Sequence, residues 1–227
     1  MNLSVKTNKI SAIHPKLGPL LYVSSVQYFL LQLLVGLRFS PRYSLANNTI
    51  SDLANTNCGV FNNRQVCSPL HSLMNISFIV LGIVMIAGSM FLYNQFKKSR
   101  SVLIGFSLFA IGGIGVILVG LFPENTFPVF HSIGAALPFL VGNIGVIVLG
   151  FTLKISQPMS IYTVSTGLIA LIALGLYASS HYLGLGAGGI ERVVAYPQTI
   201  WMIVVGIYFL SQPNFPTSKC IASSRRK

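Results

Sequence analysis

The sequence predicts an all-α fold: a polytopic membrane bundle of six transmembrane helices with both termini in the cytoplasm. Hydrophobic residues make up 53% of the 227 residues and charged residues only 8%, whereas a soluble domain averages about 25% charged residues. Apolar runs of roughly the 20 residues that cross a bilayer recur along the chain. The basic residues are distributed unequally between the two sets of connecting segments, and this asymmetry predicts the orientation.

The connecting segments are short and leave no room for a separate soluble domain. The last span is the shortest because Pro197 stands near its start, where a first helical turn tolerates proline. We divide the chain into an N-terminal cytoplasmic segment (1–16), a six-helix domain (17–212) and a basic cytoplasmic tail (213–227). The spans are predicted at residues 17–38, 69–93, 102–122, 129–152, 159–180 and 196–211.

The orientation follows from the positions of the basic residues. If the amino terminus is cytoplasmic, four of the 15 basic residues lie outside, which leaves 11 inside. The positive-inside rule therefore predicts a multi-pass protein of the cell membrane with cytoplasmic termini. A net charge of +12 would suggest nucleic acid as the partner of a soluble protein. Here the basic segments flank spans, so membrane lipids are the expected partners and nucleic acid is not.

The first span is expected to be retained in the mature protein. A cleavable signal peptide has an apolar region of about 7–15 residues, and the stretch from Leu17 to Phe39 is longer. Within this span, Ser24, Ser25 and Gln27 are expected to form hydrogen bonds between helices.

The segment after the first span carries Cys58 and Cys67, nine positions apart. Disulfides persist on the outer side of a membrane, so we predict a bridge between them. The alternative is a metal site, but two thiols without a nearby CxxC or HxH pattern do not make a zinc site.

The second span opens with polar residues at four-residue spacing, which places them in a stripe on one face of the helix. This stripe has two interpretations: a polar seam against a neighbouring helix, or the lining of an outward-facing pocket. Its members are Ser68, His71, Ser72 and Asn75.

The third span is expected at the packed centre of the bundle, because small residues let helix backbones approach closely in lipid. Pro138 in the fourth span is expected to kink the helix and free a carbonyl. Asn143, deeper in the same span, is expected to form a buried hydrogen bond. The glycines of the third span are Gly105, Gly112, Gly113, Gly115 and Gly120.

After the fifth span, a glycine-rich loop is expected to carry Glu191 and Arg192 just ahead of the sixth span. Three aromatic residues, Tyr196, Trp201 and Tyr208, are expected to anchor that last helix at the membrane interfaces.

All three acidic residues and three of the four histidines fall on the predicted outer side. Titratable groups at the end of a membrane helix are costly unless they are paired or hydrated, and they often mark function. Imidazoles and carboxylates near one plane suit a divalent metal or a general acid–base pair; the alternative is that they hold loops together. No cofactor other than this divalent metal is predicted. The candidate site residues are Asp52, His71, Glu124, His131, Glu191 and Arg192, and the candidate metal ligands are His71, His131 and His181.

Four motifs resemble one family, the prokaryotic six-helix membrane proteins catalogued as domain of unknown function 998. The resemblance spans most of residues 18–212, implies a six-helix bundle and draws attention to Asp52, His71, Glu124, His131, Glu191 and Arg192; it implies no activity. Ala54 departs from it, because glycine is expected there. The motifs are Ile50-Ser51-Asp52-Leu53, Ser68-Pro69-Leu70-His71 with Asn75, Gly120-Leu121-Phe122-Pro123-Glu124-Asn125 with His131, and Gly189-Ile190-Glu191-Arg192 with Tyr196-Pro197 and Trp201.

Three functions compete. The favoured one is a non-catalytic membrane component, either a subunit of a larger complex, whether a homo-oligomer or a complex with other membrane subunits, or a structural element whose outer polar cluster holds loops together. The alternative is a membrane-embedded, metal-dependent enzyme acting on a lipid-like substrate at the outer leaflet, with His71 and His131 as acid–base groups or ligands and Arg192 as an anion clamp. The third is a small transporter, whose charged groups should approach the bilayer midplane; here only the uncharged Asn143 does.

Overall fold

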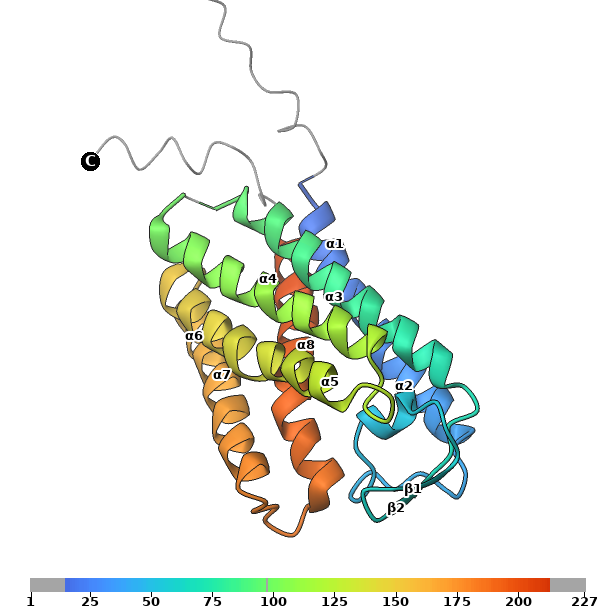
Figure 1. Ribbon diagram of the computed structural model, residues 1–227. Helices are drawn as coiled ribbons and strands as arrows, with labels where there is room; N and C mark the ends of the chain where they lie inside the picture. Colours follow the sequence, from blue (N-terminus) through green and yellow to red (C-terminus); the bar gives the residue numbers. More distant parts are fainter. Residues whose placement is uncertain (1–14, 97, 213–227) are drawn as a thin grey trace, which may run out of the picture.

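The computed structural model describes residues 15–96 and 98–212, which fold into a mostly helical bundle (Figure 1). Six helical segments are long and apolar enough to cross a membrane, as predicted, and the chain is a multi-pass membrane protein. The predicted tail, and all but the last two residues of the predicted N-terminal segment, lie outside the described residues. The spans are α1 with α2 (Leu17–Ser24, Gln27–Leu37), α3 (His71–Tyr93), α4 (Arg100–Leu121), α5 with η3 and α6 (Pro128–Ala136, Leu137–Gly142, Asn143–Thr152), α7 (Gln157–Ala178) and α8 (Gly186–Ser211).

The two ends of the bundle differ. At one end, short connections join α3 to α4 and α6 to α7. At the other, three connections gather: residues 38–70, 122–127 and 179–185 (Figure 1). We call this second end the hairpin end, because residues 38–70 contain the two-stranded sheet.

The sheet is one antiparallel hairpin of β1 (Gly59–Phe61) and β2 (Arg64–Val66). Asn62 and Asn63 form its turn with positive φ angles of 46° and 61°, as the favoured two-residue hairpin turns require. A disulfide between Cys58 and Cys67 closes the hairpin, which confirms the predicted bridge. The same segment contains the short 3₁₀ turn η2 (Ser51–Ala54).

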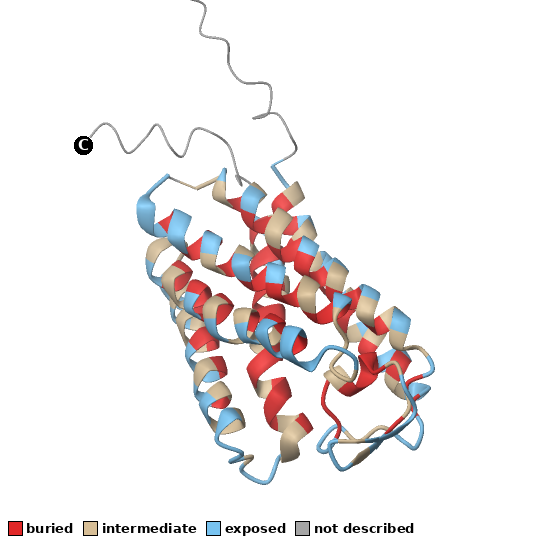
Figure 2. Ribbon diagram, in the orientation of Figure 1, coloured by how far each residue is buried: buried red, intermediate tan, exposed pale blue. Residues whose placement is uncertain are grey.

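The helices are exposed along their outward faces (Figure 2). Large aliphatic side chains on these faces are mostly exposed, among them Leu30 at 60%, Ile83 at 52% and Ile172 at 65%. Contiguous apolar surface of this extent is rare on a soluble monomer, so it indicates contact with lipid.

The centre of the bundle is held by backbone contact at glycines. A Cβ added to Gly82 of α3 would lie 2.4 Å from the Gly113 carbonyl of α4, and one added to Gly115 would lie 2.4 Å from the Gly134 carbonyl of α5. These contacts confirm that the third span is packed against its neighbours through its glycines.

The aromatic core lies where α1, α4 and α8 meet. Rings of Tyr22, Phe109 and Trp201 pack with centroids 5.2 to 6.0 Å apart. Trp201 is fully buried, and its indole N–H donates to Thr163 Oγ1 at 3.0 Å. The prediction that Trp201 anchors α8 at a membrane interface is therefore wrong, because this face of α8 points into the bundle.

The fourth span changes its helical form at Pro138. Residues Leu137–Gly142 form a π-helix, a rare form that occurs mostly as a short bulge inside an α-helix. Asn143 Nδ2 donates to the Phe139 carbonyl at 2.9 Å, which confirms the predicted buried hydrogen bond.

The sixth span is longer than predicted. Its helix, α8, begins at Gly186 and runs through Pro197, whereas the sequence predicts a glycine-rich loop up to residue 195. Glu191 and Arg192 therefore lie on the buried side of a helix and not in a loop. Their side chains form hydrogen bonds with residues 43–50.

Candidate functional site

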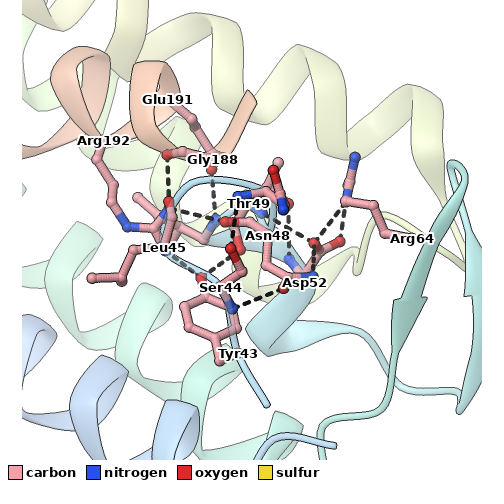
Figure 3. Close-up of polar contacts among 12 residues, drawn as sticks. Tyr43, Ser44, Leu45, Asn48, Thr49, Asp52, Arg64, Gly188, Glu191 and Arg192 are labelled. Atoms are coloured by element: carbon pink, nitrogen blue, oxygen red, sulfur yellow. Dashed lines mark hydrogen bonds and ion pairs between the residues drawn. The ribbon is translucent and has the colours of Figure 1, made fainter. Parts of the chain in front are cut away.

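The polar groups of the hairpin end gather around Asp52, which is fully buried on η2 (Figure 3). Its carboxylate accepts from Nε and Nη2 of Arg64 at 2.9 and 3.0 Å, which is a two-pronged ion pair. It also accepts from Asn48 Nδ2 and from the Thr49 N–H, both at 3.0 Å. In return, the Asp52 N–H donates to Thr49 Oγ1 at 3.1 Å. The two residues thus cap the turn reciprocally, in the manner of a capping box.

These bonds decide the charge state of Asp52. Burial raises the pKa of its carboxyl, but the hydrogen bonds from Arg64 and Asn48 favour the charged form by more, so its pKa lies below the ordinary 3.8. A carboxylate with several donors retains its charge even when buried. Asp52 is therefore ionised at neutral pH and fully used in holding the hairpin to η2.

Arg192 connects α8 to the loop of residues 43–49 (Figure 3). Its Nη1 donates to the carbonyls of Leu45, Asn48 and Gly188 at 3.0, 2.9 and 2.7 Å. Its Nη2 donates to the Tyr43 hydroxyl, and the guanidinium lies over the Tyr43 ring, 5.3 Å from the centroid. The side chain is therefore a clamp between helix and loop.

Glu191 holds the same loop from the neighbouring position of α8. Its Oε2 accepts from the Ile50 N–H at 2.5 Å. The hydrogen-bond partner of this carboxylate oxygen is therefore a backbone N–H.

The first turn of α8 is capped by the loop. The N–H groups of Gly188 and Gly189 donate to the Ala46 carbonyl at 2.8 and 3.2 Å, which satisfies two donors that a helix start otherwise leaves free. A Cβ on Gly188 would lie 2.1 Å from the Asn48 carbonyl. This close approach leaves no room for a larger side chain, which explains why glycine stands at this position of the helix.

Glu124, from the turn between α4 and α5, brings a second carboxyl to Asp52. Burial and the adjacent Asp52 carboxylate raise the pKa of Glu124 to about 9. At neutral pH Glu124 therefore retains its proton and donates it toward Asp52. Its Oε1 is buried and has no hydrogen-bond partner among the described residues.

Other polar residues tie η2 and residues 55–57 to the helices. Ser68 Oγ donates to the Leu53 carbonyl at 2.6 Å, and Asn75 Nδ2 donates to the Ala54 carbonyl at 3.0 Å. Asn125 exchanges two hydrogen bonds with Thr56. Of the two interpretations of the polar stripe, these contacts favour a seam, made with η2 and not with a helix.

His131 forms a pair with Ser51, the first residue of η2. Its Nδ1 lies 2.9 Å from the Phe122 carbonyl, and a carbonyl only accepts, so Nδ1 carries hydrogen. In the neutral ring, Nε2 is then the acceptor for the Ser51 hydroxyl, 3.0 Å away. A histidine oriented in this way is placed to take the proton of a nucleophilic serine.

Ser51 also lines a small cavity among the helices. Its volume is about 40 Å³, which is room for about three waters. Gln198 Oε1 is buried beside it without a partner among the described residues. A lipid-like substrate does not fit this cavity unless helices move. Its polar lining is Tyr28, Ser51, Glu191, Gln198 and Thr199.

The structure brings together four of the six predicted site residues: Asp52, Glu124, Glu191 and Arg192. His131 joins them through Ser51. His71 lies at the start of α3, where its Nδ1 is 3.4 Å from Ser72 Oγ.

His181 lies after α7, exposed, with its Nδ1 2.9 Å from the Ser179 carbonyl. Within residues 15–96 and 98–212, no three His, Cys, Asp or Glu side chains lie close enough to hold a metal ion. The geometry therefore gives the metal prediction no support.

The sequence analysis missed four residues of the site: Asn48, Thr49, Ser51 and Arg64. A signal for two of them was present, because Thr49-Ile50-Ser51-Asp52 has the Thr-x-x-acid spacing of a capping box. Arg64 had no local signal. It reaches Asp52 only because the hairpin turn and the disulfide set its position.

Comparison with known families gives one match. The family model described as protein of unknown function (DUF998) matches residues 23–208, in agreement with the resemblance noted from the four motifs. Comparisons with curated proteins and with solved structures find no match.

Proposed function

Because the chain belongs to the family described as protein of unknown function (DUF998), which brings no activity with it, we propose a function from the geometry of the hairpin end. The protein is a non-catalytic integral component of the cell membrane. It holds residues 38–70 as a rigid, disulfide-closed segment on the outer surface, with both termini in the cytoplasm.

The observation that supports this proposal is that the buried charged side chains form their hydrogen bonds within the chain itself. Asp52 accepts four hydrogen bonds and Arg192 donates four, all within the chain. Glu191 is bonded to the Ile50 backbone. Apart from Arg192 Nε, which is buried without a partner among the described residues, these donors and acceptors are engaged by the chain's own loop and helix, whereas catalytic groups need capacity left for a reacting atom.

The orientation is supported by two independent features: the excess of basic residues in those segments of the sequence that are predicted to be cytoplasmic, and the disulfide at the hairpin end. It is tested with the natural cysteines in intact cells and a membrane-impermeant maleimide. Cys58 and Cys67 should react only after an impermeant reductant is added. Cys220, which lies outside the described residues, should react only after the cells are permeabilised. Labelling of Cys220 in intact cells, absent from Cys220→Ser, would contradict the proposed orientation.

A second candidate, an enzyme, is favoured by the Ser51–His131 pair alone. If it is correct, a fluorophosphonate probe should phosphonylate Ser51 Oγ with loss of fluoride, and the hydroxyl proton should pass to His131 Nε2. The non-catalytic proposal expects no labelling of the purified protein above the level of Ser51→Ala. Labelling that Ser51→Ala and His131→Ala both abolish, in variants with wild-type melting temperature, would replace the proposal with a serine hydrolase.

A further inference from the structure

A groove with mostly polar residues in its lining lies on the surface of the hairpin end, and Asn48 and Arg64, which bond to the buried Asp52, form part of it. It is formed where three segments meet: the loop near residues 41–48, the hairpin turn at 62–65, and the connection from α7 to α8. Its volume is about 580 Å³, within the roughly 300–1,000 Å³ range of small-molecule sites. The groove therefore has room for a ligand that the internal cavity cannot hold.

The lining of the groove is basic and rich in amides. None of the described residues that line it is acidic. Arg42 is exposed and forms no ion pair in the described part of the chain. Arg64 uses Nε and Nη2 for Asp52 and has Nη1 left over. Guanidinium and amide N–H donors on one surface match the oxygens of a phosphate group. The side chains that carry this chemistry are Arg42, Asn47, Asn62, Arg64, Gln65 and Tyr182.

The walls of the groove are fixed before any ligand arrives. The hairpin wall is closed by the disulfide and pinned by the ion pair with Asp52. The loop wall is held by Arg192. At the floor, Gly186 has a φ of +75°, and a Cβ there would lie 2.3 Å from the Ala46 carbonyl. A site that is already ordered loses less entropy when it binds.

Exposed leucines follow two of the lining residues in the chain, and they indicate where the ligand comes from. Leu45 follows the lining residue Ser44 and is 64% exposed, while Leu183 follows Tyr182 and is 72% exposed. A free anion gains nothing from exposed leucines, but the first carbons of an acyl chain do. We propose that this groove binds the phosphate group of a membrane lipid, with the glycerol end of its chains against these leucines. The inference goes beyond the structural role proposed above.

The test uses the full-length protein purified in a phosphate-free, non-ionic detergent. Binding is measured by titration with three probes: dioctanoyl phosphatidylglycerol, inorganic phosphate, and dioctanoylglycerol, which lacks the phosphate. The phospholipid should bind at least tenfold more tightly than either of the others. If inorganic phosphate binds as tightly as the phospholipid, the groove recognises free phosphate and the lipid proposal is wrong. Equal binding of dioctanoylglycerol would overturn the phosphate as the recognised group.

Two variants locate the site and one serves as a matched control. Arg42→Gln removes an exposed, unpaired cation, and Gln65→Glu adds a negative charge to the lining without a change of shape. Each should weaken phospholipid binding about tenfold or more. Arg38→Gln removes an equally exposed arginine that does not line the groove and should leave affinity within twofold. If Arg42→Gln and Gln65→Glu bind as well as the wild type, or if all three variants weaken binding alike, the groove is not the site.

Discussion

Replacing Arg192 with glutamine should release the loop of residues 43–49 from α8. The shorter, neutral side chain cannot reach the same acceptors, so the Asn48 carbonyl is left buried without this donor, while the Gly188 carbonyl keeps the backbone bond of its own helix. A buried polar group without its partner costs about 1–3 kcal/mol. The third acceptor, on Leu45, belongs to an exposed residue, and water can replace the donor there.

About 2 kcal/mol for the buried Asn48 carbonyl and about 1 kcal/mol for the lost bond to the Tyr43 hydroxyl give a loss of about 3 kcal/mol in the free energy of unfolding. For a chain of this size each kcal/mol lowers Tm by roughly 2–4 °C, so Arg192→Gln should melt roughly 6–12 °C below the wild type. Tm is measured in detergent by the fluorescence of Trp201, the single tryptophan. Amide hydrogen exchange should become faster in residues 43–50 before it does so in α3 and α4.

Arg42→Gln is the matched control, because it makes the same chemical change at an exposed arginine. Its Tm should lie within about 1 °C of the wild type, as is usual for surface substitutions. If the two variants melt together, or if exchange in residues 43–50 is unchanged in Arg192→Gln, then Arg192 is not a clamp and the structural interpretation of the cluster fails.

Other predictions concern a proton, a close contact and a hydrogen bond. Because the pKa of Glu124 is raised to about 9, its contribution to stability is complete below the ordinary pKa of 4.5 and is lost as the pH rises through 9. In melting curves recorded between pH 5 and 10, Glu124→Gln should remove this decline. A decline that is unchanged in Glu124→Gln would assign it to another group. Gly188→Ala should lower Tm by several degrees, since its Cβ would meet the Asn48 carbonyl at 2.1 Å, whereas Gly175→Ala in α7 has nothing within 4 Å and should be neutral or slightly stabilising. Asn143→Leu should cost about 1 kcal/mol of unfolding free energy in denaturant titrations, because it removes the side-chain donor at the π-helix; no loss would show that water replaces the amide.

The helices could be predicted from the sequence because lipid imposes a length on every span. Run length and charge counts indicated six spans, and cysteine spacing indicated the disulfide. The start of α8 was missed because glycine propensity argues against a helix at Gly186–Gly189. Tertiary contact overrides this propensity, since the loop carbonyls of Ala46 and Asn48 approach so closely that larger side chains are excluded.

The candidate site was harder to predict, because run length gives the depth of a residue in the membrane but not its position around the bundle. His71, His131 and His181 all belong to the same end of the molecule, yet only His131 faces η2. The element that organises the hairpin end is η2 itself. A four-residue turn has no periodic pattern, so hydrophobic periodicity does not reveal it.

The dependence of η2 on α8 has a consequence for biosynthesis. Residues 48–56 leave the ribosome early, but two of their anchors, Glu191 and Arg192, are among the last of the described residues to be translated. Until the final helix inserts, the hairpin segment has no partner on that side. A nascent chain that stops short of Gly186 would leave this segment without its contacts to α8 and exposed to membrane proteases. Proteolysis would then distinguish a truncated chain from one that contains the last helix.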